Sequence, residues 1–290
     1  MKNLVAVCRP YFPPNVTHEI LEEFRPLMCP MDVTMVKAMS YLEMFLPTYN
    51  TVETRSTTFD LWFDELMGFW EACPNLPLFE TSLMALFTRL ADHTMGHIDW
   101  SKFIPMFMTR IVQHFDLPVR FKNVQMQRAN FMDLNLAARL MTALMTSNPE
   151  IFVNLNQLFS ALDSYFHSAN VGRHSMKLVQ FLFGLVSNFV NKIYKERFRR
   201  RKSWGAVQIP EEKKISNDQI TTFVSFLMPV VLNGMYFKAS LLFEKILQNL
   251  ASMRPELVIA PVMERLFTAF DTLTEPHKLT ANMSSEHCQS

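Results

Sequence analysis

Apolar side chains recur every three or four residues along most of the chain, which is the spacing of one face of an α-helix. The stripes comprise Met35, Ala38, Met39, Leu42, Phe45 and Leu46; Phe59, Trp62, Phe63, Leu66, Met67 and Trp70; Phe79, Leu83, Leu86, Phe87 and Leu90; Phe103, Ile104, Phe107, Ile111 and Phe115; Ile151, Leu155, Leu158, Phe159, Leu162 and Phe166; Leu242, Phe243, Ile246, Leu247 and Leu250; and Val258, Ile259, Val262, Leu266 and Phe270. No stretch shows the sustained two-residue alternation of a half-buried strand. The pattern therefore predicts an all-α chain, with the tryptophans and phenylalanines of the stripes in its core.

Helix-breaking residues separate the stripes and mark the expected connections. Prolines stand between them at Pro47, Pro74, Pro77, Pro118, Pro149 and Pro255. Ser216 followed by Gln219 has the spacing of a capping box, which predicts a helix beginning near residue 217. The pattern also predicts loops over 49–57, 118–130 and 203–215. We expect one helical segment over 1–274 and a polar, frayed tail over 275–290.

Two helix pairs resemble each other. The pairs are 83–91 with 99–115 and 242–251 with 255–270. Each second helix has an early proline followed by an arginine, at Pro105 and Arg110 and at Pro261 and Arg265. A unit of about 40 residues that cannot bury its apolar face alone is typical of stacked repeats. The sequence therefore predicts a HEAT/armadillo-like α-solenoid of antiparallel helix pairs, with a compact irregular helical domain as the alternative.

The composition supports a large helical core. Hydrophobic residues make up 49% of the 290 positions and charged residues 19%, which excludes a disordered chain. Only 6 glycines occur, so tight β-hairpins and phosphate-cradling loops are disfavoured. The formal net charge of +1 gives no general attraction to nucleic acid or to a membrane surface.

The uncharged stretch from Gln219 to Phe237 approaches the length of a membrane-spanning helix. It contains polar residues and a proline, so we interpret it as a helix buried inside a helical protein. The four cysteines, Cys8, Cys29, Cys73 and Cys288, show no paired spacing. With no recognisable signal peptide, they are interpreted as reduced thiols of an intracellular protein.

Catalytic and cofactor-binding signatures are absent from the sequence. It contains no GxSxG, GxGxxG, Walker or HExxH motif, so no catalytic residue and no cofactor are predicted. His93 and His97, with Asp92 and Asp99, form a possible metal set on paper. Gly96 places a turn between His93 and His97. Histidines on a solvent-facing loop lack the neighbouring hydrogen-bond partners that hold metal ligands in position. We therefore predict no metal and no enzymatic activity.

One strongly charged stretch stands out. Seven cations lie between residues 192 and 202, opposed only by Glu196, for a local charge of +6. The seven are Lys192, Lys195, Arg197, Arg199, Arg200, Arg201 and Lys202. Clustered guanidinium groups suit a polyanion or an acidic partner, and Arg173 and Lys177 are secondary candidates. The alternatives are a localisation signal and a solvated helix end whose cations complement the helix dipole.

Several stretches resemble the large HEAT-repeat, Blm-type proteasome activators. The similar stretches are CRPYFPP (8–14), LEEFRPLMCPMDVTMVKAMSYLEMFLP (21–47), LWFDELMGFW (61–70), LFTRLAD (86–92), HIDW (97–100), LQNLASMRPELVIAPVMERL (247–266) and LTEPHKLTA (273–281). They occur in order over nearly the whole chain, and the similarity weakens around 118–135 and over the last nine residues. Generic helical periodicity would not produce this match, which disfavours the alternative of an unrelated HEAT scaffold or nuclear-transport-type module.

The resemblance implies a function in protein binding. Members of this family form a dome of HEAT-like repeats over the proteasome core particle, contact its α-ring, open its gate and stimulate peptide hydrolysis without ATP. They are linked to degradation of acetylated histones, DNA repair and spermatogenesis, in nucleus and cytoplasm. They bind inositol phosphates in basic openings of the dome, which are not assignable to residues here. Neither a membrane nor a specific nucleic-acid sequence is implied as a partner.

The chain resembles a piece from the N-terminal third of such an activator. The family's C-terminal tail, which inserts into an α-ring pocket, has no counterpart here, nor has its bromodomain-like region. We therefore expect a fragment or a short product. A solenoid segment without terminal caps exposes apolar end faces, so we expect the isolated chain to associate.

Overall fold

The computed structural model describes residues 2–13, 15–29, 32–48, 58–73, 77–115, 117, 134–145, 149–167, 173–198, 211–235 and 240–271. Within these ranges the regular structure is helical and no strand occurs, which confirms the predicted all-α class. The helices are α1 (Lys2–Cys8), α2 (Val16–Phe24), α3 (Thr34–Phe45), α4 (Phe63–Ala72), α5 (Pro77–His93), α6 (Ile104–His114), α7 (Leu134–Leu144), α8 (Glu150–Leu162), α9 (Arg173–Phe198), α10 (Asn217–Gly234), α11 (Ser240–Met253) and α12 (Pro255–Asp271). Short 3-10 turns lie at Arg9–Tyr11, Arg25–Leu27, Phe59–Leu61, Ser101–Phe103, Asp163–Phe166 and Glu211–Lys213.

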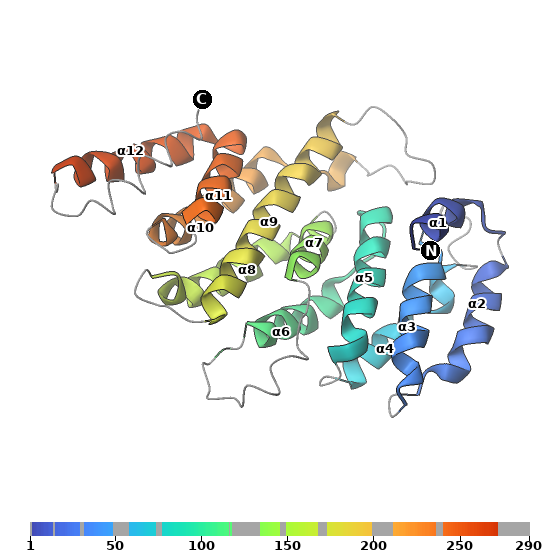
Figure 1. The fold of residues 1–290 in the computed structure, drawn as a ribbon. Helices are drawn as coiled ribbons and strands as arrows, with labels where there is room; N and C mark the ends of the chain where they lie inside the picture. The colour runs from blue at the N-terminus through green and yellow to red at the C-terminus, as the bar shows by residue number, and fades with distance from the viewer. Residues whose placement is uncertain are drawn as a thin grey trace.

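The helices stack in an array in which alternate helices are neighbours. Helix α3 packs on α5, α5 on α7, α7 on α9 and α9 on α11. A second row of contacts joins the even-numbered helices of the C-terminal half, where α10 packs on both α8 and α12. The array extends from α1 and α2 at one end to α12 at the other (Figure 1). Each helix therefore buries its apolar stripe against the next helices along the stack, as in an α-solenoid.

Local sequence signals explain where these helices begin. Ser216 precedes α10, and its side chain accepts a hydrogen bond from the Gln219 backbone N–H at 3.2 Å. The Gln219 side chain in turn accepts from the Ser216 backbone N–H at 2.9 Å, so the predicted capping box is present. Both bonds satisfy amide groups that the first turn of a helix leaves without partners.

Helix α10 carries most of the long uncharged stretch. The segment Glu211–Gly234 is long and apolar enough to cross a membrane by length and composition alone. In this fold Phe223, Leu227 and Val231 are buried in the core, and α10 packs on α8 and α11. The apolar character of α10 is thus used in helix–helix packing, as the sequence predicted.

Aromatic side chains form the centre of the N-terminal half. The Trp70 and Phe87 rings stack with centroids 5.5 Å apart, and Phe107 lies 5.2 Å from Trp70. Trp62 and Trp100 are also fully buried in this cluster. The predicted tryptophan and phenylalanine stripes are therefore core, joining α4, α5 and α6.

Two details differ from the sequence-based expectation. Ile259 and Phe270 belong to the predicted stripe of the last helix, yet they are 37% and 44% exposed, because no described helix lies beyond α12 to cover them. Residues 211–213 form a 3-10 turn where a loop was expected. The predicted loops 49–57 and 118–130, the segment 203–210 and the tail 275–290 lie outside the described residues.

Candidate functional site

The basic stretch begins in the last turns of α9. Lys195 and Arg197 are exposed there, and one Arg197 nitrogen donates to the side-chain oxygen of Asn217 at 2.7 Å. Cations in the last turn of a helix complement the negative end of its dipole. Arg199, Arg200, Arg201 and Lys202 lie outside the described residues. The structure therefore places two of the seven predicted contact residues on an accessible surface.

Lys192 differs from the prediction, because its side chain is buried. Its residue is 5% exposed, and its ammonium donates to the carbonyl oxygens of Thr142 and Ala143 at 2.7 and 3.0 Å. Burial lowers the pKa of Lys192 to about 8, and the nearby Glu196 and Asp92 carboxylates oppose that shift. An ammonium that is sealed between helices and bonded to two carbonyls is not a surface ligand for a polyanion.

The contact of Lys192 is one of a series of cation clamps. We use this name for a cation on one helix that donates to C-terminal carbonyls of the helix two places earlier. The clamps are Arg89 on α5 to Glu43 and Leu46 at the end of α3; Arg110 on α6 to Trp70 and Cys73 at the end of α4; Lys192 on α9 to Thr142 and Ala143 at the end of α7; and Arg265 on α12 to Leu232 near the end of α10. The last four carbonyls of a helix have no partner within it, so a cation from the neighbouring repeat satisfies them.

The clamps bear directly on the predicted repeat. Arg110 and Arg265 were singled out as equivalent residues of two similar helix pairs, and both make the same kind of contact with a helix two places earlier. Arg110 and Arg265 therefore share one structural role, which is to cap carbonyls of an earlier helix. The roles of Arg89 and Lys192 were missed, although a cation inside an otherwise apolar helical stripe was an available signal.

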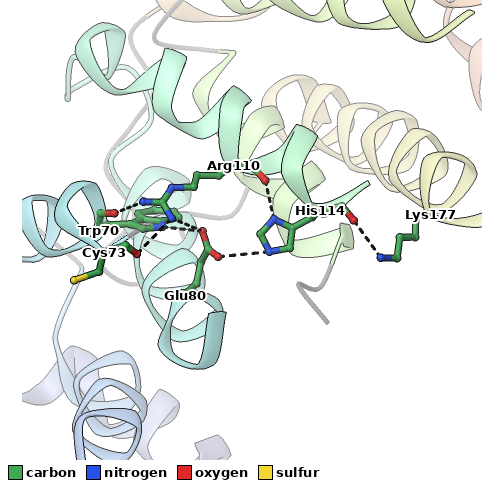
Figure 2. Close-up of polar contacts among 6 residues, drawn as sticks. All are labelled: Trp70, Cys73, Glu80, Arg110, His114 and Lys177. Atoms are coloured by element: carbon green, nitrogen blue, oxygen red, sulfur yellow. Dashed lines mark hydrogen bonds and ion pairs between the residues drawn. The ribbon is translucent and has the colours of Figure 1, made fainter. Parts of the chain in front are cut away.

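A buried polar network surrounds the Arg110 clamp (Figure 2). The Glu80 carboxylate, on α5, accepts from the indole N–H of Trp70 at 3.1 Å. The Arg110 guanidinium lies 3.6 Å from one carboxylate oxygen, and the His114 ring lies 3.5 Å from the other. Glu80 is 5% exposed and Arg110 is 4% exposed, so this charge pair lies between helices. It links α4, α5 and α6 through one carboxylate.

The network continues to α9 through His114. Its Nδ1 lies 2.7 Å from the backbone oxygen of Arg110, within α6. The ammonium of Lys177 donates to the backbone oxygen of His114 at 3.2 Å (Figure 2). Lys177, a secondary candidate for anion binding, therefore contacts the C-terminus of α6, while the Arg173 side chain lies outside the described residues. The whole arrangement fixes how four helices stack.

The residues of the possible metal set have separate partners. Asp92 forms an ion pair with Arg139, and Asp99 accepts a hydrogen bond from the Ser101 backbone N–H at 3.0 Å. His93 ends α5 and its Nδ1 lies 2.7 Å from the Thr48 hydroxyl, so the expectation of a solvent-facing loop histidine was wrong. Burial, with help from the Arg89, Arg9 and Arg139 charges, lowers the pKa of His93 to about 3. Across the described ranges, no group of three or more potential ligands comes together.

Comparisons with known proteins show what this chain is similar to. Residues 155–287 match the family model described as "Proteasome activator complex subunit 4, mid HEAT repeats region". The chain is 44% identical over 288 residues to "Proteasome activator complex subunit 4" of Homo sapiens and 43% identical to that of Xenopus laevis. "Proteasome activator subunit 4" of Arabidopsis thaliana is 24% identical over 303 residues. Each match covers 98% of this chain and 16% of the relative, so the chain spans about one sixth of the length of these relatives.

Proposed function

Because this chain belongs to the proteasome activator complex subunit 4 family, we propose that it forms part of the helical wall with which such an activator caps the proteasome core particle. One observation supports the proposal above the others: 44% identity extends over 98% of the chain. The stacked helices are consistent with that assignment. The family model of the mid HEAT-repeat region matches residues 155–287. The position of this chain within the N-terminal third of an activator stays a prediction.

The proposed mechanism is binding without chemistry in this segment. The names of the relatives indicate a regulator of the proteasome rather than a peptidase. We infer that a rigid solenoid wall positions the outer α-ring, opens its gate and thereby stimulates peptide and protein degradation without ATP. Rigidity is supported by the cation clamps, because each one ties the end of one helix to the helix two places along.

The finer parts of the proposal follow the family resemblance. We propose action in nucleus and cytoplasm, including degradation of acetylated histones recognised by other parts of the activator, in DNA repair and spermatogenesis. Inositol phosphates are proposed ligands of the assembled activator. The exposed Lys195 and Arg197 at the end of α9 are the described residues that would favour such an anion or an acidic partner.

A chimeric activator provides the test. The homologous segment of the human relative is replaced by residues 2–271 of this chain, and core particles are assayed for binding and for hydrolysis of a fluorogenic peptide. We expect the chimera to bind and to stimulate hydrolysis, whereas an activator lacking the segment does neither. A chimera that sediments as a single folded species but neither binds nor stimulates would contradict the proposal.

A further inference from the structure

Helices α1, α2 and α3 form a unit at one end of the array that joins the other helices through α3 (Figure 1). Both α1 and α2 pack on α3, and α3 in turn packs on α5. In addition, Arg25 in the turn after α2 pairs with Glu65 of α4 at 2.8 Å, on the exposed surface. Repeats of a stacked array contact only their neighbours, so a terminal unit can open while the remaining helices stay folded.

A polar cluster holds the joint between α3 and α5. Arg89 of α5 donates to the backbone oxygen of Leu46 at 2.7 Å and to the hydroxyl of Thr48 at 3.2 Å. His93 lies one turn after Arg89, and its Nδ1 is 2.7 Å from the same hydroxyl. Thr48 follows α3 and is fully buried. An opening between α3 and α5 therefore breaks these contacts and brings water to the partly buried His93 ring.

The His93 ring lies among cations. Three guanidinium groups act on it, those of Arg89 on α5, Arg9 in the turn after α1 and Arg139 on α7. The Glu43 carboxylate of α3 lies 3.4 Å from Arg89, and the Asp92 carboxylate of α5 is paired with Arg139. A proton on His93 adds a positive charge beside these cations in the closed joint, whereas water solvates that charge once the joint is open. The open joint therefore binds the proton more tightly than the closed joint does.

We propose that His93 makes the joint between α3 and α5 acid-sensitive, so that the α1–α3 unit detaches from α5 when His93 takes up a proton. The closed joint excludes the proton and the open joint accepts it, so a fall in pH shifts the equilibrium toward the open joint. Burial, with help from the three arginine charges, lowers the pKa of His93 to about 3 in the closed array, against an ordinary value of 6.5. Between these two values the ratio of open to closed joints grows by up to about tenfold for each pH unit.

The test is hydrogen exchange of the full chain, followed by mass spectrometry for peptides from α3 and α9 and corrected for the intrinsic pH dependence of exchange. Between about pH 7.5 and 4.5, we expect the opening constant of α3 to rise by roughly 50- to 100-fold. This range stays above about pH 4, where ordinary carboxyl groups titrate. Helix α9 packs on both α7 and α11, so its opening constant should be lower than that of α3 at every pH.

Two results of this experiment would overturn the proposal. An opening constant of α3 that does not change with pH would mean that His93 takes no part in holding the joint. Equal opening constants for α3 and α9 would mean that His93 reaches water only when the whole chain unfolds, so that no separate unit detaches. Both measurements use the unsubstituted chain and therefore do not require that any variant folds.

Two variants separate His93 from the other groups that titrate. His93→Asn keeps a polar side chain beside Thr48 but removes the ring that takes up the proton, so the rise for α3 should shrink to about threefold or less. His18→Asn is the matched control, because His18 belongs to the same unit but is 66% exposed on α2, and the full rise should remain. A His93→Asn variant that keeps the full rise, or a His18→Asn variant that loses it, would overturn the assignment to His93.

Discussion

The Arg110 clamp makes a quantitative prediction about stability. Replacing Arg110 with Met keeps an apolar stem of similar shape but removes three interactions. The carbonyls of Trp70 and Cys73 lose a donor, and the buried Glu80 carboxylate loses a cation 3.6 Å away. Removing one partner of a buried ion pair typically costs about 3–5 kcal/mol, because the other charge stays in the interior. Glu80 keeps the Trp70 indole and the nearby His114 ring, so we expect the lower end, about 3 kcal/mol.

The matched control is Arg265→Met. Arg265 makes the corresponding clamp to Leu232 but is only half-buried, so water can replace much of what the guanidinium supplies. We expect this substitution to cost about 1 kcal/mol, the typical net value of a hydrogen bond. The contrast between the two variants isolates the contribution of burial and of Glu80 from that of carbonyl capping itself.

The assay is urea unfolding of a double-mutant cycle between Arg110→Met and Glu80→Gln. The Glu80→Gln substitution keeps a side-chain oxygen that accepts from Trp70 but removes the charge that Arg110 balances. We expect the double variant to be more stable than the sum of the single effects by about 1–3 kcal/mol. Additive single effects within about 0.5 kcal/mol, or an Arg110 variant no less stable than the Arg265 variant, would refute the reasoning.

Three further predictions concern pH, packing and association. The folded-state pKa of His93 is about 3 against an ordinary value of 6.5, so the unfolded chain binds the proton first as the pH falls. Between pH 6.5 and about 3, His93 should lower the free energy of unfolding by up to about 1.4 kcal/mol for each pH unit, and urea midpoints of a His93→Asn variant should lack this contribution. Gly68→Ala should stabilise the chain by about 0.5–1 kcal/mol, because nothing lies within 4 Å of the added methyl group and alanine favours the helix. Gly234→Ala should instead destabilise it by about 1–3 kcal/mol, because the new Cβ would lie 2.1 Å from the Phe243 ring; thermal unfolding of both variants checks the opposite signs. Finally, Phe267 is 60% exposed on α12, and Ile259 and Phe270 of the same helix are also exposed, so the isolated chain should associate and Phe267→Glu should reduce this association. Sedimentation of a clean monomer at every concentration would count against it.

Interactions between residues close together in the sequence account for the structural features that could be predicted. A helix is formed by contacts three and four residues apart, so apolar spacing located α3 to α6, α8, α11 and α12, and the Ser216–Gln219 capping box located the start of α10. No stripe was assigned to α1, α2, α7 or α9. The scarcity of glycine and the absence of alternating strands indicated the all-α class. The similarity of the Arg110 and Arg265 segments pointed to a repeat before any contact between helices was known.

Only the stacking of helices could decide what the charged residues do. Lys192 belongs to a run of cations that resembles a solvent-facing patch, yet α9 turns it toward the end of α7, 49 and 50 residues earlier in the chain. His93 follows a helical stripe and precedes a turn, and its partner Thr48 lies 45 positions away. Pro229 of α10 and Pro261 of α12, 32 positions apart in the numbering, likewise line one pocket between these two helices.

The amino-acid sequence by itself thus determined the all-α class, the position and apolar face of most helices, and the family to which the chain is similar. The tertiary structure decided which cations are buried, which carbonyls they cap and where a pocket remains. The physical reason is the separation along the chain between the residues that interact. Helix formation depends on residues within one or two turns, whereas the environment of a charge depends on helices brought beside it from distant parts of the chain.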